Sequence, residues 1–186
     1  KPVRPPRPGR VPTDPAGVEA TVKFNDGTTE DVVVGLRLDN AQAPCTVNSF
    51  VSLAQQGFFD TTSCHRLTDS AMTSVLQCGD PTGTGSGGPG YRFANEYPTN
   101  QYRPFDPALK SPVTYPRGTL AMANSGPDSN GSQFFIVYQD SVLPPTYTVF
   151  GSIDPTGMAA VDDLVSVGVR GGEDDGPPRT PIVIES

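Results

Sequence analysis

Three places in the chain carry side chains that could do chemistry together: Arg66, Gln77 and the run Gln133 to Phe135. Each lies in or beside a short apolar run of the kind that forms a β-strand, so neighbouring strands could place a guanidinium and two amides beside a phenyl ring. An extended peptide could pair with the backbone at Asn124 and rest an apolar ring on Phe135. These residues therefore predict a peptide-binding site.

A guanidinium in such a site could accelerate rotation about the peptide bond that precedes a proline. The barrier is about 18–20 kcal/mol because amide resonance is lost when the bond twists. The cis and trans states of an X-Pro bond lie close in energy, so the equilibrium needs no outside drive. A donor aimed at the prolyl nitrogen stabilises the twisted state, in which the nitrogen lone pair is exposed. This reaction needs no nucleophile, metal or cofactor, and we expect no cofactor.

His65 is the single histidine of the chain and offers a different chemistry. Side chains alternate along a strand, so if Arg66 faces a cleft, His65 faces the core. A secreted hydrolase that uses His65 is an alternative of another class, and it predicts that His65→Ala loses activity while Arg66→Ala is tolerated. No cluster of histidine, cysteine or carboxylate residues has the ligand spacing of a metal site, so we expect none.

The run Gly83 to Gly88 matches the GxGxxG pattern of dinucleotide-binding loops. That motif needs a helix that begins at its end, so that the helix N-terminus meets the pyrophosphate. Here Pro89-Gly90 follows instead. We therefore interpret this run as a flexible surface loop.

The composition indicates one domain with many turns. The 186 residues include 20 Gly and 21 Pro, which favours a β-rich fold, and the net charge of −7 argues against a nucleic-acid partner. No run of 18 apolar residues is present, so nothing here is expected to span a membrane. Cys45, Cys64 and Cys78 leave two arrangements open, one disulfide with one free thiol or three buried thiols.

The first 16 residues differ from the rest of the chain. They hold six prolines and four basic residues without apolar periodicity, which favours extended polyproline geometry over a packed structure. We predict a Pro/Arg-rich linker at 1–16 and one folded domain at 17–186. Because the chain begins with Lys1 rather than Met, we also expect a processed or truncated product.

The elements that must position the candidate residues are mostly strands. Alternating or continuous apolar runs predict strands at 18–24, 31–38, 63–67, 75–78, 120–123, 134–138, 147–153 and 181–185. Apolar residues at helical spacing predict two amphipathic helices, one from Pro44 to Gly57 and one from Met158 to Gly168. The segment 94–118 is expected to be irregular. Together these elements predict a mainly β fold, a closed eight-stranded antiparallel barrel capped by two helices.

Two stretches carry a family resemblance. Met122 to Pro127, MANSGP, and Asn130 to Ile136, NGSQFFI, resemble the signature of the cyclophilins, a family of peptidyl-prolyl cis-trans isomerases. Cys64 to Arg66 and Gln77 to Asp80 are similar to two further elements of that family. The resemblance covers residues 18–186, and Asp80 to Gly85 is similar to bacterial members in particular. It implies a cyclophilin-like catalytic domain that isomerises X-Pro bonds.

The resemblance also implies a role for each site residue. Arg66 would be the catalytic arginine, Gln77 a polar wall and Phe135 the floor of a proline pocket. The substrate-binding residues implied by position are Val75, Ala123, Asn124, Gln133, Leu143 and Tyr147. Among these, the backbone at Ala123 and Asn124 would pair with substrate, and Gln133 would support Arg66.

The chain departs from the family pattern at the edge of this pocket. Ser74-Val75 stands where members have Phe-Met, so a second aromatic wall is missing or replaced, with Met72 as the candidate replacement. Val142 stands where many members have Trp, and Tyr147 stands at the position of a pocket histidine. These departures argue against strong cyclosporin binding. They also motivate an alternative function, a non-catalytic module that binds proline-containing segments.

Partners and location follow from the same resemblance. We expect proline-containing peptides and client proteins as partners, and a monomer. The linker is expected to lead to a membrane anchor, as in anchored actinobacterial cyclophilins. We therefore expect the domain at the extracellular face of a bacterial cell membrane or in a secreted protein, with a cytoplasmic location as the alternative.

Overall fold

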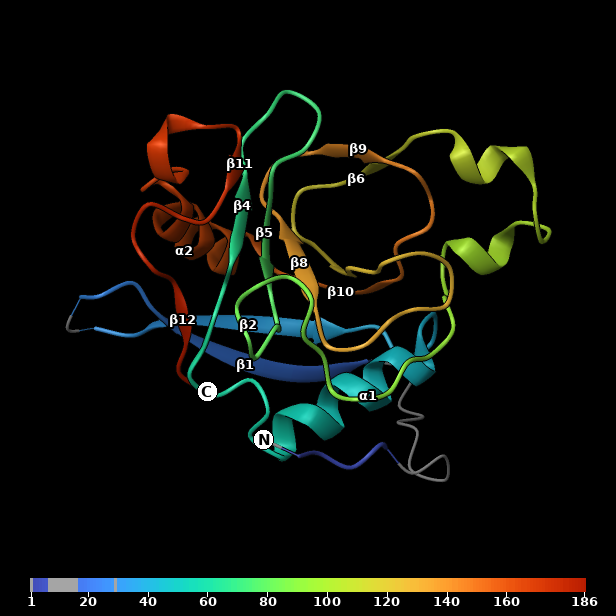
Figure 1. Ribbon diagram of the computed structural model, residues 1–186, viewed down its shortest axis with the longest axis horizontal. Coiled ribbons are helices and arrows are strands. Elements are labelled where there is room, and N and C mark those ends of the chain that lie inside the picture. The colour runs from blue at the N-terminus through green and yellow to red at the C-terminus, as the bar shows by residue number, and fades with distance from the viewer. Residues whose placement is uncertain (1, 7–16, 29) are drawn as a thin grey trace.

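The computed structural model describes residues 2–6, 17–28 and 30–186 (Figure 1). Most of the predicted linker at 1–16 therefore lies outside the described residues. The part that is described, 2–6, lies beside the first helix. There the Arg4 amide donates to Gln56 Oε1 over 2.9 Å, and Gln56 Nε2 donates to the Arg4 carbonyl over 3.0 Å.

Strands dominate the described chain. In chain order they are β1 (Val18–Asn25), β2 (Val32–Leu38), β3 (Thr62–Ser63), β4 (Arg66–Thr68), β5 (Val75–Cys78), β6 (Val113–Tyr115), β7 (Thr119–Met122), β8 (Phe134–Val137), β9 (Ser141–Leu143), β10 (Val149–Ser152), β11 (Asp175–Gly176) and β12 (Val183–Ile184). The helices are α1 (Pro44–Gln55) and α2 (Pro155–Val165), with short 3₁₀ turns at Thr99–Gln101, Pro107–Lys110 and Arg170–Gly172. A mainly β fold with two helices is confirmed.

The strands form one curled antiparallel sheet and a small second sheet. The large sheet has ten strands in the order β11-β4-β5-β8-β7-β10-β2-β1-β12-β3, and β6 pairs with β9 outside it. The expected closed eight-stranded barrel is therefore wrong in its detail. Residues 62–68 join the two ends of the sheet. They contain β3, which pairs with β12 at one end, and β4, which pairs with β5 near the other end. Residues 64 and 65 interrupt this predicted strand, so the ladder is not continuous.

The core fills the inside of the curled sheet, and the helices cover its openings on opposite sides (Figure 1). α1 buries Val47, Phe50 and Leu53. The Phe50 ring lies 5.4 Å from Phe134 and 5.1 Å from Phe150, centroid to centroid, so this helix is joined to the sheet by aromatic packing. α2 packs against β2 with an aliphatic stripe in which Met158, Val161 and Leu164 are buried.

The two helix N-termini are satisfied by different means. Asp154 caps α2 in the usual way, since its Oδ1 accepts from the Gly157 amide over 2.7 Å. α1 has no side-chain cap of its own. Instead Glu96, distant in sequence, accepts from the amide of Thr46 over 2.7 Å and from that of Cys45 over 3.3 Å. The loop that contains Glu96 is thereby fastened to α1.

The segment 94–118, expected to be irregular, is more ordered than its composition indicates. It contains two of the 3₁₀ turns and all of β6. β6 pairs with β9 beyond the main sheet, with Val113 opposite Leu143. The second sheet therefore places Leu143 above the outer face of the main sheet.

Candidate functional site

The candidate site is set by the register of three adjacent strands. Arg66 in β4 lies opposite Gln77 in β5, and Gln77 lies opposite Phe135 in β8. Residues directly opposite each other in an antiparallel sheet point to the same face. Arg66, Gln77 and Phe135 therefore form one row across the sheet.

Apolar side chains gather around the Phe135 end of this row. A second hydrophobic cluster, separate from the main core, includes Val75, Tyr115, Ala121, Phe135 and Val137, with Ala123, Leu143 and Tyr147 packed against it. The Tyr147 ring lies edge-on to the Phe135 ring, with 5.7 Å between centroids. This cluster forms the floor and one wall of a hollow.

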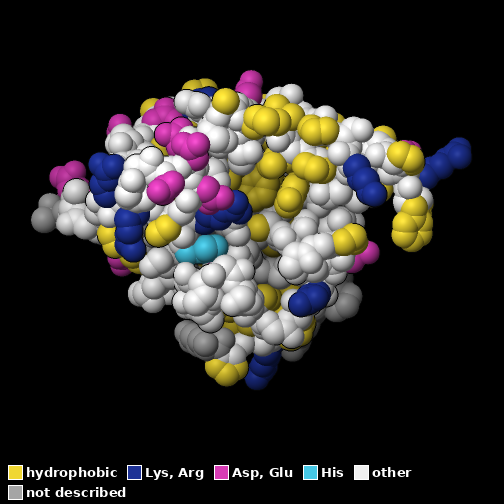
Figure 2. Space-filling view, turned by 45° about the horizontal axis from the view of Figure 1, so that its top comes forward, with side chains coloured by type: hydrophobic (Ala, Val, Ile, Leu, Met, Phe, Trp, Pro, Cys, Tyr) yellow, Lys and Arg dark blue, Asp and Glu magenta, His cyan; other side chains and the backbone are white. Residues whose placement is uncertain are grey.

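The hollow has a volume of about 330 Å³ and opens beside Arg66. It is lined by eight of the nine residues predicted for the site: Arg66, Val75, Gln77, Ala123, Asn124, Phe135, Leu143 and Tyr147. In Figure 2 hydrophobic side chains lie inside the hollow, with basic and acidic side chains next to each other on one wall. We call it the apolar pocket. A larger hollow of about 1240 Å³ adjoins it and shares Arg66 and Gln77.

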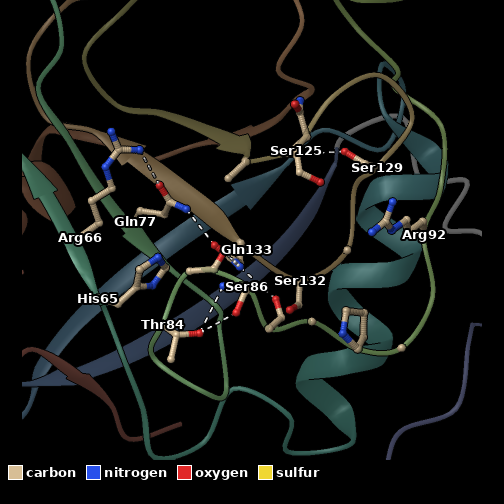
Figure 3. A pocket seen from close by; sticks show the side chains of 18 of the residues that line it. His65, Arg66, Gln77, Thr84, Ser86, Arg92, Ser125, Ser129, Ser132 and Gln133 are labelled. Atoms are coloured by element: carbon tan, nitrogen blue, oxygen red, sulfur yellow. Dashed lines mark hydrogen bonds between the residues drawn. The ribbon is translucent and has the colours of Figure 1, made fainter.

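Gln133, the ninth predicted residue, lies in the larger hollow (Figure 3). Gln77 Nε2 donates to Gln133 Oε1 over 2.8 Å, and Arg66 Nη1 donates to Gln77 Oε1 over 3.4 Å. Gln133 Nε2 in turn donates to the carbonyls of Gly85 and Gly87. The predicted support of Arg66 by Gln133 is therefore indirect, because Gln77 lies between them.

The loop that holds Gln133 is built around the buried carboxylate of Asp80. This carboxylate accepts hydrogen bonds from Thr82 and from the amides of Thr84, Gly85 and Gly87. Burial acts to raise the pKa of Asp80, but these hydrogen bonds outweigh it and lower the pKa to about 2. The GxGxxG run is thus an exposed loop held from inside by one ionised side chain.

Asp175 is the site residue that sequence reasoning missed. It lines both hollows, and its carboxylate accepts from Arg66 Nε over 2.8 Å and from Arg66 Nη2 over 2.7 Å. This hydrogen-bonded pair lowers the pKa of Asp175 and raises that of Arg66. The two residues are 109 positions apart, and only the pairing of β11 with β4 brings them together.

The expectation that His65 faces the core is wrong. His65 is half-buried and lines the larger hollow on the same side as Arg66 (Figure 3). It lies between β3 and β4 rather than within a strand, so strict alternation does not apply. Burial lowers the pKa of His65, and its Nδ1 has no hydrogen-bond partner among the described residues. The histidine thus lacks the orienting group that a catalytic base requires.

The structure also decides three smaller questions. Cys64 and Cys78 form a disulfide and Cys45 is a free, exposed thiol, so the first of the two cysteine arrangements is found. Met72 is 59% exposed and does not line the apolar pocket, so the proposed replacement of the aromatic wall is wrong. Across the described part of the chain, no group of residues could hold a metal ion and no helix could span a membrane.

The curled sheet, with an arginine-edged apolar pocket on its outer face, defines a cyclophilin-type fold and site. The sequence model of the family "Cyclophilin type peptidyl-prolyl cis-trans isomerase/CLD" matches residues 21–186. The chain therefore belongs to the cyclophilin-type peptidyl-prolyl cis-trans isomerase family.

Named relatives agree with this assignment. The chain is 63% identical over 186 residues to "Probable peptidyl-prolyl cis-trans isomerase B" of Mycobacterium leprae, matching all of this chain and 61% of the relative. It is 37% identical over 187 residues to "Peptidyl-prolyl cis-trans isomerase A" of Mycobacterium tuberculosis, matching 92% of this chain and 91% of the relative. The chain thus spans about three fifths of the length of the more similar relative.

A solved structure shows the same fold. A cyclophilin-type peptidyl-prolyl cis-trans isomerase of Cryptosporidium parvum superposes with a TM-score of 0.60 at 29% identity, over 91% of this chain and 99% of that one. The same Cryptosporidium protein has also been solved in the presence of the dipeptide Ala-Pro.

Proposed function

We propose that this domain accelerates cis-trans isomerisation of X-Pro bonds in peptides and folding proteins. The observation that carries the proposal is the row formed by Arg66, Gln77 and Phe135, which places a guanidinium at the rim of an apolar pocket. Membership of the cyclophilin family and the Ala-Pro dipeptide used with the Cryptosporidium relative support the same substrate class.

The pocket supplies what the reaction needs. Phe135 and Tyr147 form an aromatic corner that can hold a proline ring. Arg66 lies beside it and donates toward the prolyl nitrogen as the bond twists, which stabilises the twisted state more than either planar state. Gln77 holds one side of the guanidinium. Every step is a positioned hydrogen bond, and the reaction forms no covalent intermediate.

The substrate backbone has a restricted set of partners at Ala123. The Ala123 amide already donates to the Gln133 carbonyl over 3.0 Å, so it cannot also donate to a bound peptide. The predicted hydrogen bonds to the substrate backbone would therefore be made by the Ala123 carbonyl and the Asn124 amide. The Asn124 side chain is itself held by a 2.8 Å hydrogen bond to the Thr146 carbonyl, which fixes this edge of the pocket.

The test is exchange of a short X-Pro peptide, measured by NMR or by a protease-coupled assay. Wild-type protein should accelerate exchange, and Arg66→Ala should lose about 10²-fold in kcat/KM because one donor to the transition state is removed. Arg66→Lys should recover only part of this loss, since a lysine has no planar fork. An Arg66→Ala protein that folds normally and keeps full activity would contradict the proposal.

A second function is a binding module that captures proline-containing segments without turnover. It is favoured by one observation, the departure from the family pattern at the edge of the pocket, where Ser74-Val75 replaces Phe-Met and Tyr147 lines the pocket in place of a histidine. The same assay separates the two functions. Binding of the peptide without faster exchange would establish the binding module, whereas acceleration by the wild-type domain excludes it.

We also propose an exported, monomeric domain that follows a membrane-anchored linker. The Cys64–Cys78 disulfide supports an oxidising compartment, where such bonds persist. Cell fractionation with a membrane-impermeant thiol label on Cys45 tests the location, because only an exported domain is labelled in intact cells. Analytical ultracentrifugation tests whether the domain is a monomer.

We further propose that the domain binds cyclosporin weakly. Val142 stands where many family members have Trp, and the chain contains no Trp. A cyclosporin titration would measure the affinity.

A further inference from the structure

Arg66 lies between two strands that each offer it an acceptor. On one side, Gln77 in β5 is its direct cross-strand partner. On the other side, β11 pairs with β4 so that Asp175 lies opposite Thr68 and Gly176 opposite Leu67. This register makes Asp175 the diagonal neighbour of Arg66 on the same face of the sheet, within reach of a long side chain.

The contact between Arg66 and Asp175 is a two-point fork. Nε donates to Oδ1 over 2.8 Å and Nη2 donates to Oδ2 over 2.7 Å, which fixes the plane of the guanidinium as well as its position. A guanidinium has five N–H donors. Asp175 uses two and Gln77 uses one on Nη1, so two hydrogens remain for a substrate.

The backbone around Asp175 is itself anchored. Beyond the β11–β4 pairing, the Asp69 amide donates to the Asp174 carbonyl over 2.8 Å, and the Arg170 amide donates to the Pro177 carbonyl over 2.9 Å. Asp175 is therefore held by hydrogen bonds on both sides of the residue. Its carboxylate therefore projects from an anchored stretch of backbone, from which it can orient a flexible arginine.

A role in folding stability explains this pair less well. The side chains of Arg66 and Asp175 are 47% and 53% exposed, and exposed ion pairs contribute little to stability. A role in orienting Arg66 explains the pair better. A half-exposed arginine has many rotamers, and a small misplacement of a catalytic donor has a large effect on rate.

We infer that Asp175 is a positioning residue that holds the Arg66 guanidinium in the orientation required at the prolyl nitrogen. The inference rests on the proposed isomerase function. Asp175 acts through Arg66 and touches neither of the reacting atoms. The free hydrogens of Nη1 and Nη2 then point in a fixed direction before the peptide arrives, so their alignment needs no further ordering.

The chain offers a matched control for this ion pair. Arg117 and Asp162 form a second fork, with Nη1–Oδ1 and Nη2–Oδ2 distances of 2.7 and 2.8 Å and side chains 40% and 47% exposed. This fork fastens α2 to the segment before β7, and neither residue lines the apolar pocket or the larger hollow. Asp175→Asn and Asp162→Asn therefore remove equivalent charges inside and outside the site.

The experiment measures X-Pro exchange in wild type, Asp175→Asn and Asp162→Asn. Asp175→Asn should lower kcat about 10-fold with KM unchanged, because one acceptor of the fork is lost while the apolar pocket is intact. Asp162→Asn should stay within twofold of wild type. Asp175→Glu, which keeps the carboxylate on a longer stem, should recover part of the loss.

A double-mutant cycle shows whether Asp175 acts through Arg66. In an Arg66→Ala background, Asp175→Asn should change kcat by less than twofold, since there is no guanidinium left to orient. The Arg66 Nε–H signal in NMR should also be sharp and slowly exchanging in wild type and lose both properties in Asp175→Asn.

Different outcomes overturn different conclusions. An active wild type with an unaffected Asp175→Asn variant overturns the positioning role alone. An effect of Asp175→Asn that persists in Arg66→Ala also overturns it, because the carboxylate would then act on the substrate directly. A wild-type protein that does not accelerate exchange overturns the isomerase proposal and the positioning role with it, whatever the NMR signal shows.

Discussion

Arg66 and His65 are neighbours in sequence that differ in what surrounds their polar atoms. The Arg66 guanidinium has an acceptor on each side, Asp175 and Gln77, whereas His65 Nδ1 has none among the described residues. A side chain that is held by partners can direct a hydrogen bond, and one that is not held cannot act as an oriented base. At the level of single residues, these hydrogen bonds therefore favour Arg66 over His65 as the residue that carries the proposed reaction.

His65→Ala tests this conclusion. We expect isomerase activity to stay within about threefold of wild type, because His65 lines only the larger hollow and contributes no hydrogen bond to Arg66. Burial lowers the pKa of His65, so the histidine is neutral near pH 7, and its titration adds no step to the activity profile at higher pH. A fall in activity as large as that of Arg66→Ala would instead favour the histidine-dependent alternative.

At the level of elements, the site depends on a loop and on strand pairing. The row from Arg66 to Phe135 needs three strands in register, and the support of Gln77 passes through Gln133 to the loop around Asp80. An alanine at Gly87 would place its Cβ 2.0 Å from Asp80 Oδ1, so this loop has no space for a side chain there. The loop is therefore held by several hydrogen bonds to Asp80 and is closely packed at Gly87, despite its glycine content.

Asp80→Asn should release this loop. The lowering of the Asp80 pKa from 3.8 to about 2 corresponds to about 2 kcal/mol of stability near neutral pH, from 1.36 kcal/mol per pKa unit. Because the pKa is lower in the folded protein, this stability is present above about pH 4 and is lost as the pH falls through about 2.

Urea denaturation of wild type and Asp80→Asn over this pH range measures the effect. The difference in unfolding free energy between the two proteins should shrink as the solution becomes more acidic. A difference that stays constant down to pH 2 would show that the ionised carboxylate does not stabilise the loop.

At the level of the whole molecule, the two ends of the large sheet meet near the Cys64–Cys78 disulfide. Cys64 lies in the break between β3 and β4, and Cys78 ends β5, so the bond crosses the place where the ladder is interrupted. The residues next to these cysteines include His65 and Gln77, which line the larger hollow. The disulfide thus reinforces the seam of the sheet directly beneath the site.

Reduction of this disulfide should destabilise the domain by about 3 kcal/mol, the value expected for a loop of about 15 residues. Denaturation with and without reductant, compared with a Cys64→Ser/Cys78→Ser protein, measures the effect. In thiol titration, one cysteine should react in the native protein and three after reduction and unfolding, since only Cys45 is free and exposed. Three reactive thiols before reduction would contradict the bond.

Features that are encoded locally along the chain could be predicted from the residues alone. Apolar periodicity located both helices and the longer strands, and the strand β5 was predicted with its observed bounds, Val75–Cys78. The short strands β6, β9 and β11 were missed because two or three residues carry too little periodicity to be recognised. Local chemistry suggested Arg66, Gln77, Asn124, Gln133 and Phe135, and the motif between Met122 and Ile136 indicated the family, whose pattern added the other four: Val75, Ala123, Leu143 and Tyr147.

Contacts between segments that are distant in sequence became known from the folded chain. In the fold, Asp175 pairs with Arg66 across 109 positions, His65 lines a hollow instead of the core, and Cys64 forms a disulfide with Cys78. These contacts depend on strand register and on the curl of the sheet, which arise from packing summed over the whole core. A periodic pattern records which face of a strand is buried, whereas the identity of the neighbour across the ladder is fixed only when the sheet has formed.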